Sequence, residues 1–417
     1  MPVSIRSIGT ALPPTVIDQP HIRDVFRSQP DLGRLAPRLI GAVFDGAAID
    51  TRHTVIAELG AEPTGVGGAP DAAPLSADGG PDDDAATPTF YDRAEGRILR
   101  PTTGTRNDVY VAESPDLFAR AAEEALAGAA GITAADVTHV VTVSCTGFFA
   151  PGPDYLLVRR LGLPATTRRL HIGFMGCYGA FPALRSARDT CLADPDAVVL
   201  VVCAELCTLH LRSSDDPDAI IASSVFADGA AAAVVTARPA PAGETVLDLD
   251  VLETVLTPVG EDDMAWSIGD QGFDMVLSSY VPHIVEENID DALVPLLAAE
   301  GVRVGDVTRW AVHPGGRSIL DRVQQRLGLS DPQMAPSREV LRTRGNMSSA
   351  TVLFILREHL VPDAVPVAAA VDVGLAGGAA APTGAADVAP ARERVCAMAF
   401  GPGLTVETSL LTRRVAA

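Results

Sequence analysis

The sequence predicts a layered α/β fold, and two observations lead to that prediction. Segments with strand character alternate along the chain with segments of helical periodicity, which is typical of helices packed on a sheet. The chain has 417 residues, of which 47% are hydrophobic. It can therefore bury a large core, either as two domains or as one large α/β unit.

The individual elements follow from apolar and β-branched runs, which predict strands, and from apolar residues at helical spacing, which predict helices. The expected strands are His139–Val143, Arg169–Phe174, Ala197–Cys203, Thr245–Leu256 and Arg394–Phe400, and the expected helical regions are Asp154–Leu161 and Phe273–Ala299. Residues 61–89 and 363–390 are rich in Gly, Ala and Pro. We interpret both segments as mobile inserts that carry no chemistry.

Charge and composition exclude several classes of protein. The net charge is −21, and every basic residue is an arginine, so a nucleic-acid partner is not expected. No apolar run approaches the roughly 18 residues of a membrane helix, and the N-terminal residues lack the pattern of a secretory signal. The six cysteines have no paired spacing. We therefore expect a cytoplasmic protein with reduced thiols.

Cys177 is the strongest candidate nucleophile. It lies in Gly-Phe-Met-Gly-Cys-Tyr-Gly, where the strand Arg169–Phe174 gives way to a helical run that ends near Asp194. A thiol at the start of a helix faces unpaired N–H groups and the positive end of the helix dipole, which favour the thiolate. The alternative is a buried structural cysteine, which is common.

Two later motifs support a catalytic role for Cys177. His313 follows a short strand in Trp-Ala-Val-His-Pro-Gly-Gly-Arg, before a helix with apolar residues at Ile319 and Val323. Asn346 lies in Arg-Gly-Asn-Met-Ser-Ser, before a second apolar helix. Taken singly, His313 is also compatible with a core histidine and Asn346 with a helix cap. Together, Cys, His and Asn predict a catalytic set.

At this point the chain resembles the type III polyketide synthases, the chalcone synthase-like enzymes, and its bacterial members in particular. The motifs that carry the resemblance are Gly-Cys-Tyr-Gly-Ala, His-Pro-Gly-Gly, Gly-Asn-Met-Ser-Ser, Phe-Gly-Pro-Gly-Leu, Pro-Thr-Thr-Gly-Thr-Arg and Cys-Thr-Gly-Phe-Phe-Ala-Pro-Gly-Pro-Asp. The resemblance runs from about Ile49 to the C-terminus. It implies a thiolase-like fold with layered α-β-α-β-α architecture in two pseudo-duplicated halves, 1–243 and 244–417. The duplication itself is not evident in the sequence pattern.

The resemblance also implies the reaction. Cys177, paired with His313 as thiolate and imidazolium, takes an acyl group from an acyl-CoA starter. Malonyl-CoA then loses carbon dioxide, and His313 and Asn346 stabilise the enolate oxygen. The lengthened chain passes back to CoA. No metal, nicotinamide or flavin is needed, and the enzyme is expected to be a homodimer.

Further residues are assigned through the resemblance. Phe226 and Phe273 match the two phenylalanines that separate the CoA tunnel from the cavity. The expected cavity wall consists of Cys145, Thr146, Ala150, Glu205, Cys207, His210 and Ser348. Arg52 lies near the basic residues that meet the CoA phosphates in the family, although the surrounding basic residues of plant members are not matched. Gly315 and Gly316 are also assigned to CoA binding.

Cys203, Cys207 and His210 have the spacing of a partial metal cluster, but no fourth ligand follows, so no metal site is predicted. For the substrate, the small residues Ala150 and Cys207 favour a medium- or long-chain acyl starter, which gives alkylpyrone or alkylresorcinol-type products. Cys145 favours an alternative, a tetrahydroxynaphthalene-type synthase that uses malonyl-CoA alone. A β-ketoacyl-carrier-protein synthase III is a third possibility.

Overall fold

The strands predicted from apolar runs assemble into one mixed sheet. The computed structural model describes residues 2–60, 88–361 and 392–417. The predicted insert 363–390, and all but the last two residues of 61–89, lie outside the described residues. Within the described residues the sheet has nine strands, in the order β13 (Arg309–Val312), β14 (Glu393–Gly401), β15 (Thr405–Val415), β10 (Thr245–Leu256), β1 (Ser4–Ala11), β9 (Asp228–Thr236), β8 (Val198–Leu206), β6 (His139–Ser144) and β7 (Arg168–Gly173).

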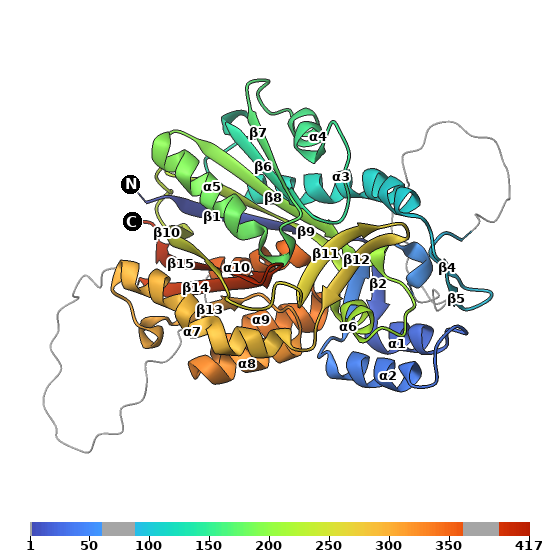
Figure 1. Cartoon of the computed structure of the whole chain (residues 1–417). Helices are drawn as coiled ribbons and strands as arrows, with labels where there is room; N and C mark the ends of the chain where they lie inside the picture. The colour runs from blue at the N-terminus through green and yellow to red at the C-terminus, as the bar shows by residue number, and fades with distance from the viewer. Residues whose placement is uncertain (1, 61–87, 362–391) are drawn as a thin grey trace, which may run out of the picture.

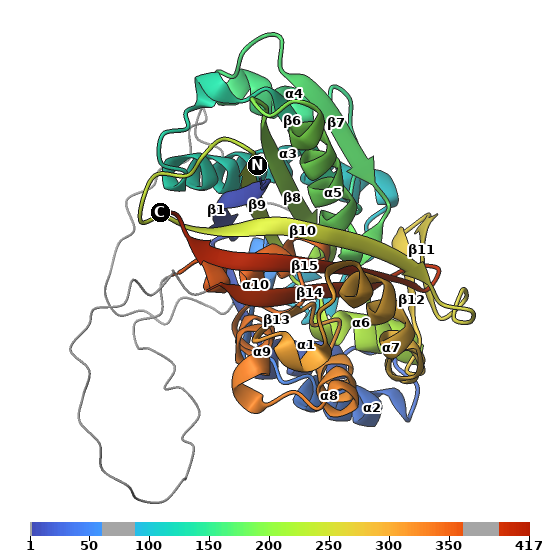
Figure 2. The same ribbon diagram turned by 90° about the vertical axis from the view of Figure 1, so that its left-hand side faces the viewer.

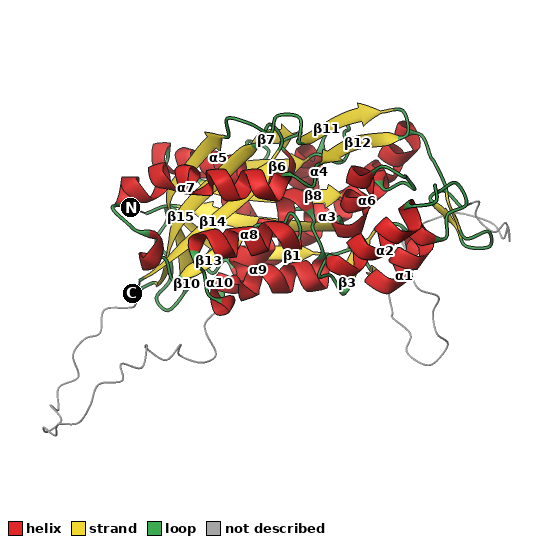
Figure 3. Cartoon of the chain, turned by 60° about the horizontal axis from the view of Figure 1, so that its bottom comes forward, coloured by secondary structure: helices red, strands yellow, loops and turns green. Residues whose placement is uncertain are grey.

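Helices cover both faces of this sheet (Figures 1 and 3). They are α1 (Gln19–Arg27), α2 (Ala36–Gly46), α3 (Thr103–Gly128), α4 (Pro153–Arg160), α5 (Ala180–Ala193), α6 (Pro217–Val225), α7 (Val281–Glu300), α8 (Arg317–Leu327), α9 (Asp331–Arg344) and α10 (Thr351–Leu360). Short hairpins pair β2 (Thr15–Asp18) with β3 (Thr51–Thr54), β4 (Tyr91–Asp92) with β5 (Arg97–Ile98), and β11 (Met264–Gly269) with β12 (Gly272–Leu277). No helix in the described ranges is long and apolar enough to cross a membrane.

The sheet is two half-sheets joined along β1 and β10, which pair over a short register, Ser4 with Asp248 and Ile5 with Leu247. Figure 2 shows β10, β15 and β14 side by side on one side of that junction. The two halves repeat one pattern of pairing. In each, a parallel pair (β6 with β8, β13 with β14) continues into antiparallel pairs.

Alternating side chains on the strands divide the apolar residues into layers. On β8, Val199 and Val201 face the core that contains α5 and α10, whereas Leu200 and Val202 face the core that contains α3. On β14, Ala397 belongs to the α5–α10 core, and its neighbours belong to a core built with α7 and α8. The order is therefore helix, sheet, helices, sheet, helices. This confirms the predicted layered fold.

The two halves also share a local sequence that the sequence analysis did not identify. Gly-Ile-Thr-Ala-Ala-Asp-Val-Thr (131–138) leads from α3 into β6, and Gly-Val-Arg-Val-Gly-Asp-Val-Thr (301–308) leads from α7 into β13. Both glycines have a positive φ, 75° at Gly131 and 63° at Gly301. Both aspartates accept a backbone N–H three residues earlier, at 2.9 Å for Asp136 and 3.0 Å for Asp306. The predicted division at residue 243 falls between β9 and β10 and stays a prediction.

Most predicted elements are confirmed to within a few residues, and one is wrong in part. Residues 273–277 were expected to begin a helix, but they belong to strand β12. Here Gly269 pairs with Gly272 across a two-residue turn, and such a turn favours a hairpin over a continuous helix. The helix α7 begins only at Val281.

Candidate active site

Cys177 lies in a tight turn between β7 and α5, as predicted. The chain leaves β7 at Gly173, passes through Phe174 with φ 56° and Gly176 with φ 70°, and forms the single-turn 3₁₀ helix η3 (Gly176–Tyr178) before α5. A Cβ on Gly176 would lie 2.7 Å from Pro402 Cδ, and one on Gly179 would lie 2.7 Å from Val143 Cγ1. Only glycine permits this close approach at both positions, so the turn holds the thiol in a fixed position.

Asn346 is brought to Cys177 from the other half of the chain. Its amide Nδ2 lies 3.9 Å from Cys177 Sγ, and its Oδ1 accepts a hydrogen bond from the Ser348 N–H at 2.9 Å. The alternative role as a helix cap is wrong, because α10 begins only at Thr351, after the 3₁₀ turn η6 (Ser348–Ala350). The Asn346 backbone bridges to Phe226, and its N–H donates to Val225 O at 2.8 Å. The side-chain amide is therefore held in place by the backbone on both sides.

His313 follows β13 directly and is completely buried. Its backbone N–H donates to Met398 O at 2.9 Å. Among the described residues neither ring nitrogen has a hydrogen-bond partner, Cys177 Sγ included. Burial lowers the pKa of His313 to about 3, and burial raises the pKa of Cys177 to about 11. In this geometry the imidazole and the thiol are both neutral.

Glu205 is a buried carboxyl group beside Cys145. It accepts hydrogen bonds from Ser349 Oγ at 2.5 Å, the Cys145 N–H at 2.9 Å and Thr146 Oγ1 at 3.0 Å. Burial nevertheless raises its pKa above the ordinary value. Cys145 Sγ lies 3.5 Å from the Glu205 carboxylate and 3.6 Å from Ser348 Oγ. Burial, and next the Glu205 charge, raise the pKa of Cys145, so Cys145 is a neutral thiol here.

Part of the candidate set lines a cavity of about 550 Å³, whereas His313, Thr146 and Glu205 are not among its wall residues. Of the residues expected from the sequence, its wall includes Cys145, Cys177, Phe226, Gly315, Gly316, Asn346 and Ser348. Three wall residues that sequence reasoning missed, Met264, Trp266 and Met275, come from the β11–β12 hairpin. The turn that closes this hairpin, Gly-Asp-Gln-Gly, is the signal that could have identified it.

A second, much smaller cavity lies behind Phe226. Cys207, His210 and Phe273 line it, and Phe226 lines both cavities. Phe226, together with Trp266 and Met275 of the β11–β12 hairpin, lines both spaces and separates them, whereas Phe273 lines only the smaller one. Ala150 lines neither of these cavities and is exposed on the described chain, so its assignment to the cavity wall is not supported within a single chain.

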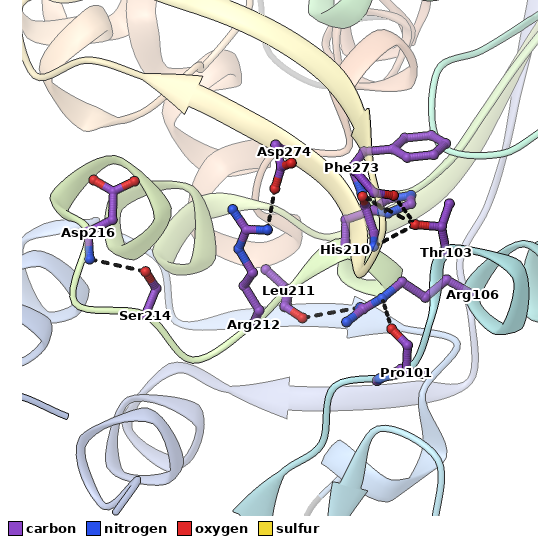
Figure 4. Close-up of polar contacts among 12 residues, drawn as sticks. Pro101, Thr103, Arg106, His210, Leu211, Arg212, Ser214, Asp216, Phe273 and Asp274 are labelled. Carbon is purple, nitrogen blue, oxygen red and sulfur yellow. Dashed lines mark hydrogen bonds and ion pairs between the residues drawn. The ribbon is translucent and has the colours of Figure 1, made fainter. Parts of the chain in front are cut away.

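Phe273 is fixed to the rest of the site through His210 (Figure 4). The two rings stack with centroids 4.1 Å apart and planes 12° apart. The Phe273 N–H donates to His210 Nδ1 at 3.0 Å, and His210 Nε2 donates to Thr146 O at 2.8 Å. The other end of the hairpin turn is held by Thr103, whose hydroxyl accepts from the Gly272 N–H at 2.8 Å. His210 therefore connects the hairpin to the loop after β6.

Cys203, Cys207 and His210 have the spacing of a partial metal cluster in the sequence, and the contacts of His210 show how they are used instead. Both nitrogens of His210 are engaged in hydrogen bonds, and Cys203 is buried in the core that contains α5 and α10. Within residues 2–60, 88–361 and 392–417 there is no group of three or more His, Cys, Asp or Glu side chains that could hold a metal ion.

The assignment of Arg52 to CoA binding needs correction. Its guanidinium is 1% exposed and donates to Ser223 O at 2.9 Å and Phe226 O at 2.6 Å. Burial lowers its pKa to about 10. A side chain in this position holds the backbone of the Phe226 partition and does not reach a phosphate in solvent. The sequence indicated a functional arginine here, but only the packing of β3 against α6 and β9 decided its role.

The sequence and the fold are both similar to those of known proteins. The family model described as chalcone and stilbene synthases, N-terminal domain, matches residues 95–239, and the corresponding C-terminal domain model matches residues 248–369. The structure is similar to that of PKS-I from the brown alga Ectocarpus siliculosus, with TM-score 0.80 and 27% identity over 99% of this chain and 98% of that chain.

Two further solved structures are similar over nearly the full length. The C-terminal type III polyketide synthase domain of Steely1, a type I/III hybrid from Dictyostelium, has TM-score 0.78 and 25% identity over 100% of both chains. The fungal type III polyketide synthase ORAS has TM-score 0.76 and 25% identity over 99% of this chain and 100% of that chain.

Replacing His210 tests its role as the connection between hairpin and loop. His210→Leu leaves the Phe273 N–H and the Thr146 carbonyl buried without partners, so the free energy of unfolding should fall by roughly 2 kcal/mol. Denaturant titration measures this, with the partly exposed His139→Leu as the matched control. A loss no greater than that of the control would contradict the role.

The pH dependence gives a second readout of the same variant. Burial lowers the pKa of His210 to about 4, below the value of about 6.5 for an exposed histidine. The unfolded chain therefore binds more protons between pH 6.5 and 4, and the stability of the wild type should fall as the pH is lowered through this range. The fall should be shallower in His210→Leu.

Proposed function

The chain belongs to the chalcone and stilbene synthases, a family of type III polyketide synthases, and we propose that it condenses malonyl-CoA onto an acyl-CoA starter held on Cys177. The observation that carries the proposal is the meeting of Cys177 with the Asn346 amide, 3.9 Å from its sulfur, on a cavity of about 550 Å³. Such a cavity has the size of a small-molecule site.

The first step is transfer of the starter. The Cys177 thiolate attacks the thioester carbonyl, and the CoA thiol leaves with the proton that His313 received from Cys177. Burial alone disfavours each charge, since the pKa of Cys177 is raised to about 11 and that of His313 is lowered to about 3. A thiolate and an imidazolium form there only as a pair, in which each charge offsets the desolvation of the other.

The second step is decarboxylation and condensation. Once acylated, Cys177 carries no charge, and His313 returns to the neutral form that its burial favours. A neutral imidazole N–H and the Asn346 amide then donate to the enolate oxygen that develops as malonyl-CoA loses carbon dioxide. One such donor typically contributes about 3–4 kcal/mol. The enolate carbon attacks the Cys177 thioester, and the product leaves on CoA. These steps need no metal, nicotinamide or flavin.

For the starter, we propose a medium- or long-chain acyl group, which gives alkylpyrone or alkylresorcinol-type products. The support is the compact Cys207 behind the Phe226 partition, together with the apolar hairpin residues Met264 and Met275 on the main cavity. Each methylene removed from water contributes about 0.8 kcal/mol, so an apolar cavity favours longer acyl chains.

Cys145 on the cavity wall favours the second candidate, a tetrahydroxynaphthalene-type synthase.

We also propose that the enzyme is a cytoplasmic homodimer. Strand β7 is an edge strand with mostly exposed residues, and Leu170 is 45% and Phe148 39% exposed nearby. Ala150 is exposed on the same loop as Phe148. An open edge strand with apolar neighbours favours pairing with a second copy.

Sedimentation equilibrium tests the dimer. The wild type should have twice the mass of the chain, and Leu170→Arg, which places a charge at the exposed edge, should have the mass of one chain. A monomeric wild type would contradict this proposal.

Product analysis tests the reaction. Wild-type enzyme with malonyl-CoA and a series of saturated acyl-CoA starters should give pyrone or resorcinol products by mass, with the highest kcat/KM at medium or long chain length. Cys177→Ala should give no acyl-enzyme adduct and no product, with the buried Cys191→Ala as the matched control. Product from malonyl-CoA alone, unchanged by any starter, would favour the second candidate.

Alkylation tests the pairing of Cys177 with His313. Of the six cysteines, Cys177 alone is partly exposed, so iodoacetamide should label it first, and peptide mapping identifies the site. An ordinary cysteine thiol has a pKa of about 8.5. If the ion pair forms, the labelling rate of the wild type should stop rising well below this pH, because Cys177 is then already a thiolate. In His313→Gln the rate should rise toward pH 11, where burial sets the pKa of Cys177. The same profile in both proteins would contradict the pairing.

A further inference from the structure

The charge of the chain makes recognition of a CoA thioester a problem that the site must solve locally. The protein carries a net charge of −21, and the nucleotide end of CoA carries several phosphate charges of the same sign. Long-range attraction is therefore absent, and binding requires nearby cations. Arg52 does not meet this requirement, because it is buried against Phe226.

Away from Cys177, the cavity has one wall of small or apolar residues and another that carries polar and charged residues. One wall comes from α2, which presents the small or apolar residues Ala42, Val43, Gly46 and Ala47. Another wall comes from the loop after His313 and from α8, with Gly315, Gly316, Arg317, Ser318, Asp321 and Arg322. Figure 1 places α2 and α8 along the same lower side of the molecule. Arg317 and Arg322 supply the arginine side chains on the described part of the cavity wall.

Both arginines are exposed enough to change partners. The side chains of Arg317 and Arg322 are 56% and 46% exposed, and they pair with Asp321 at 3.3 Å and Glu286 at 2.6 Å. The Arg317–Asp321 pair is exposed at both ends and contributes little stability, whereas the Glu286 side chain is only 20% exposed. Asp321 also pairs with Arg338 at 2.7 Å, and Glu286 lies 3.8 Å from His283, which carries a charge only when protonated. Exchange of a carboxylate for a phosphate is therefore inexpensive at Arg317, and at Arg322 it opens an ion pair with a partly buried carboxylate.

We propose that Arg317 and Arg322 bind the phosphate groups of the CoA thioesters, at the α8 wall of the cavity. Guanidinium groups suit this role because they donate charge-assisted hydrogen bonds to phosphate in pairs. The glycines at 315 and 316 leave that wall open beside the arginines, toward the Cys177 sulfur on the same cavity. This inference rests on the proposed function, and it moves the CoA phosphate site from β3 to α8.

The test compares substrates with and without phosphates. In Arg317→Ala and Arg322→Ala, KM for acyl-CoA and malonyl-CoA should rise about tenfold, and more in the double variant, because each change removes a charged hydrogen-bond donor. kcat should change little. KM for the N-acetylcysteamine thioesters of the same acyl groups, which carry no phosphate, should stay the same. Arg317→Lys and Arg322→Lys should show a smaller rise in KM for the CoA substrates than the alanine variants, because lysine keeps the positive charge.

Arg326→Ala is the matched control, since Arg326 lies on the same helix, pairs with Asp290 at 2.6 Å and is absent from the described cavity wall. Its KM values should equal those of wild type. Raising the salt concentration should weaken CoA binding in wild type more than in the double variant. An unchanged KM for CoA substrates, or an equal rise for both substrate classes, would overturn the assignment.

Direct binding separates this proposal from the proposed function. Titration calorimetry with CoA itself, and with pantetheine as the phosphate-free probe, needs no turnover. Tighter binding of CoA than of pantetheine in wild type, lost in the double variant and kept in Arg326→Ala, supports the phosphate site even if no polyketide is formed. Equal affinity of wild type and double variant for CoA overturns it, whatever the products are.

Discussion

The contact between the turns η3 and η6 is the constraint on which the site depends. These turns precede the two helices of the central layer, α5 and α10. Because both helices begin at the same end of the layers, the segments before them must meet. Gly179 and Ser349 are packed so closely that a Cβ on the glycine would lie 3.3 Å from the Ser349 Cβ. Cys177 from one half and the Asn346 amide from the other half are thus placed together by the packing of the layers.

Burial is the second physical feature of the site. Cys177, Cys145, Glu205 and His313 all have pKa values shifted toward their neutral forms, with desolvation as the largest cause in each case. A medium of low dielectric makes an isolated charge costly but strengthens interactions between charges that form together. Such a site suits a reaction in which a thiolate, and later an enolate, exists briefly beside a fixed donor.

The parts that define the cavity differ in how firmly they are held. The nucleophile turn and Asn346 belong to the central layers, whereas the β11–β12 hairpin stands apart from the main sheet (Figure 3). It is attached through polar contacts, among them those of His210 and Thr103, and through the packing of the buried Phe273 and of Met264 and Met275. The hairpin therefore shapes the cavity wall from outside the central layers that hold Cys177 and Asn346.

The positions of most strands and helices, the layered fold and the candidate nucleophile could all be predicted from the sequence, because they depend on local periodicity and on short motifs with restricted turns. It did not determine the β11–β12 hairpin, since Phe273–Leu277 is too short to distinguish a strand from the start of a helix. Tertiary packing makes Arg52 a buried support for Phe226, leaves Ala150 exposed, and brings Arg317 and Arg322 to the cavity wall. Solvent exposure and partners across the chain are set by packing between distant segments, and a linear pattern does not contain them.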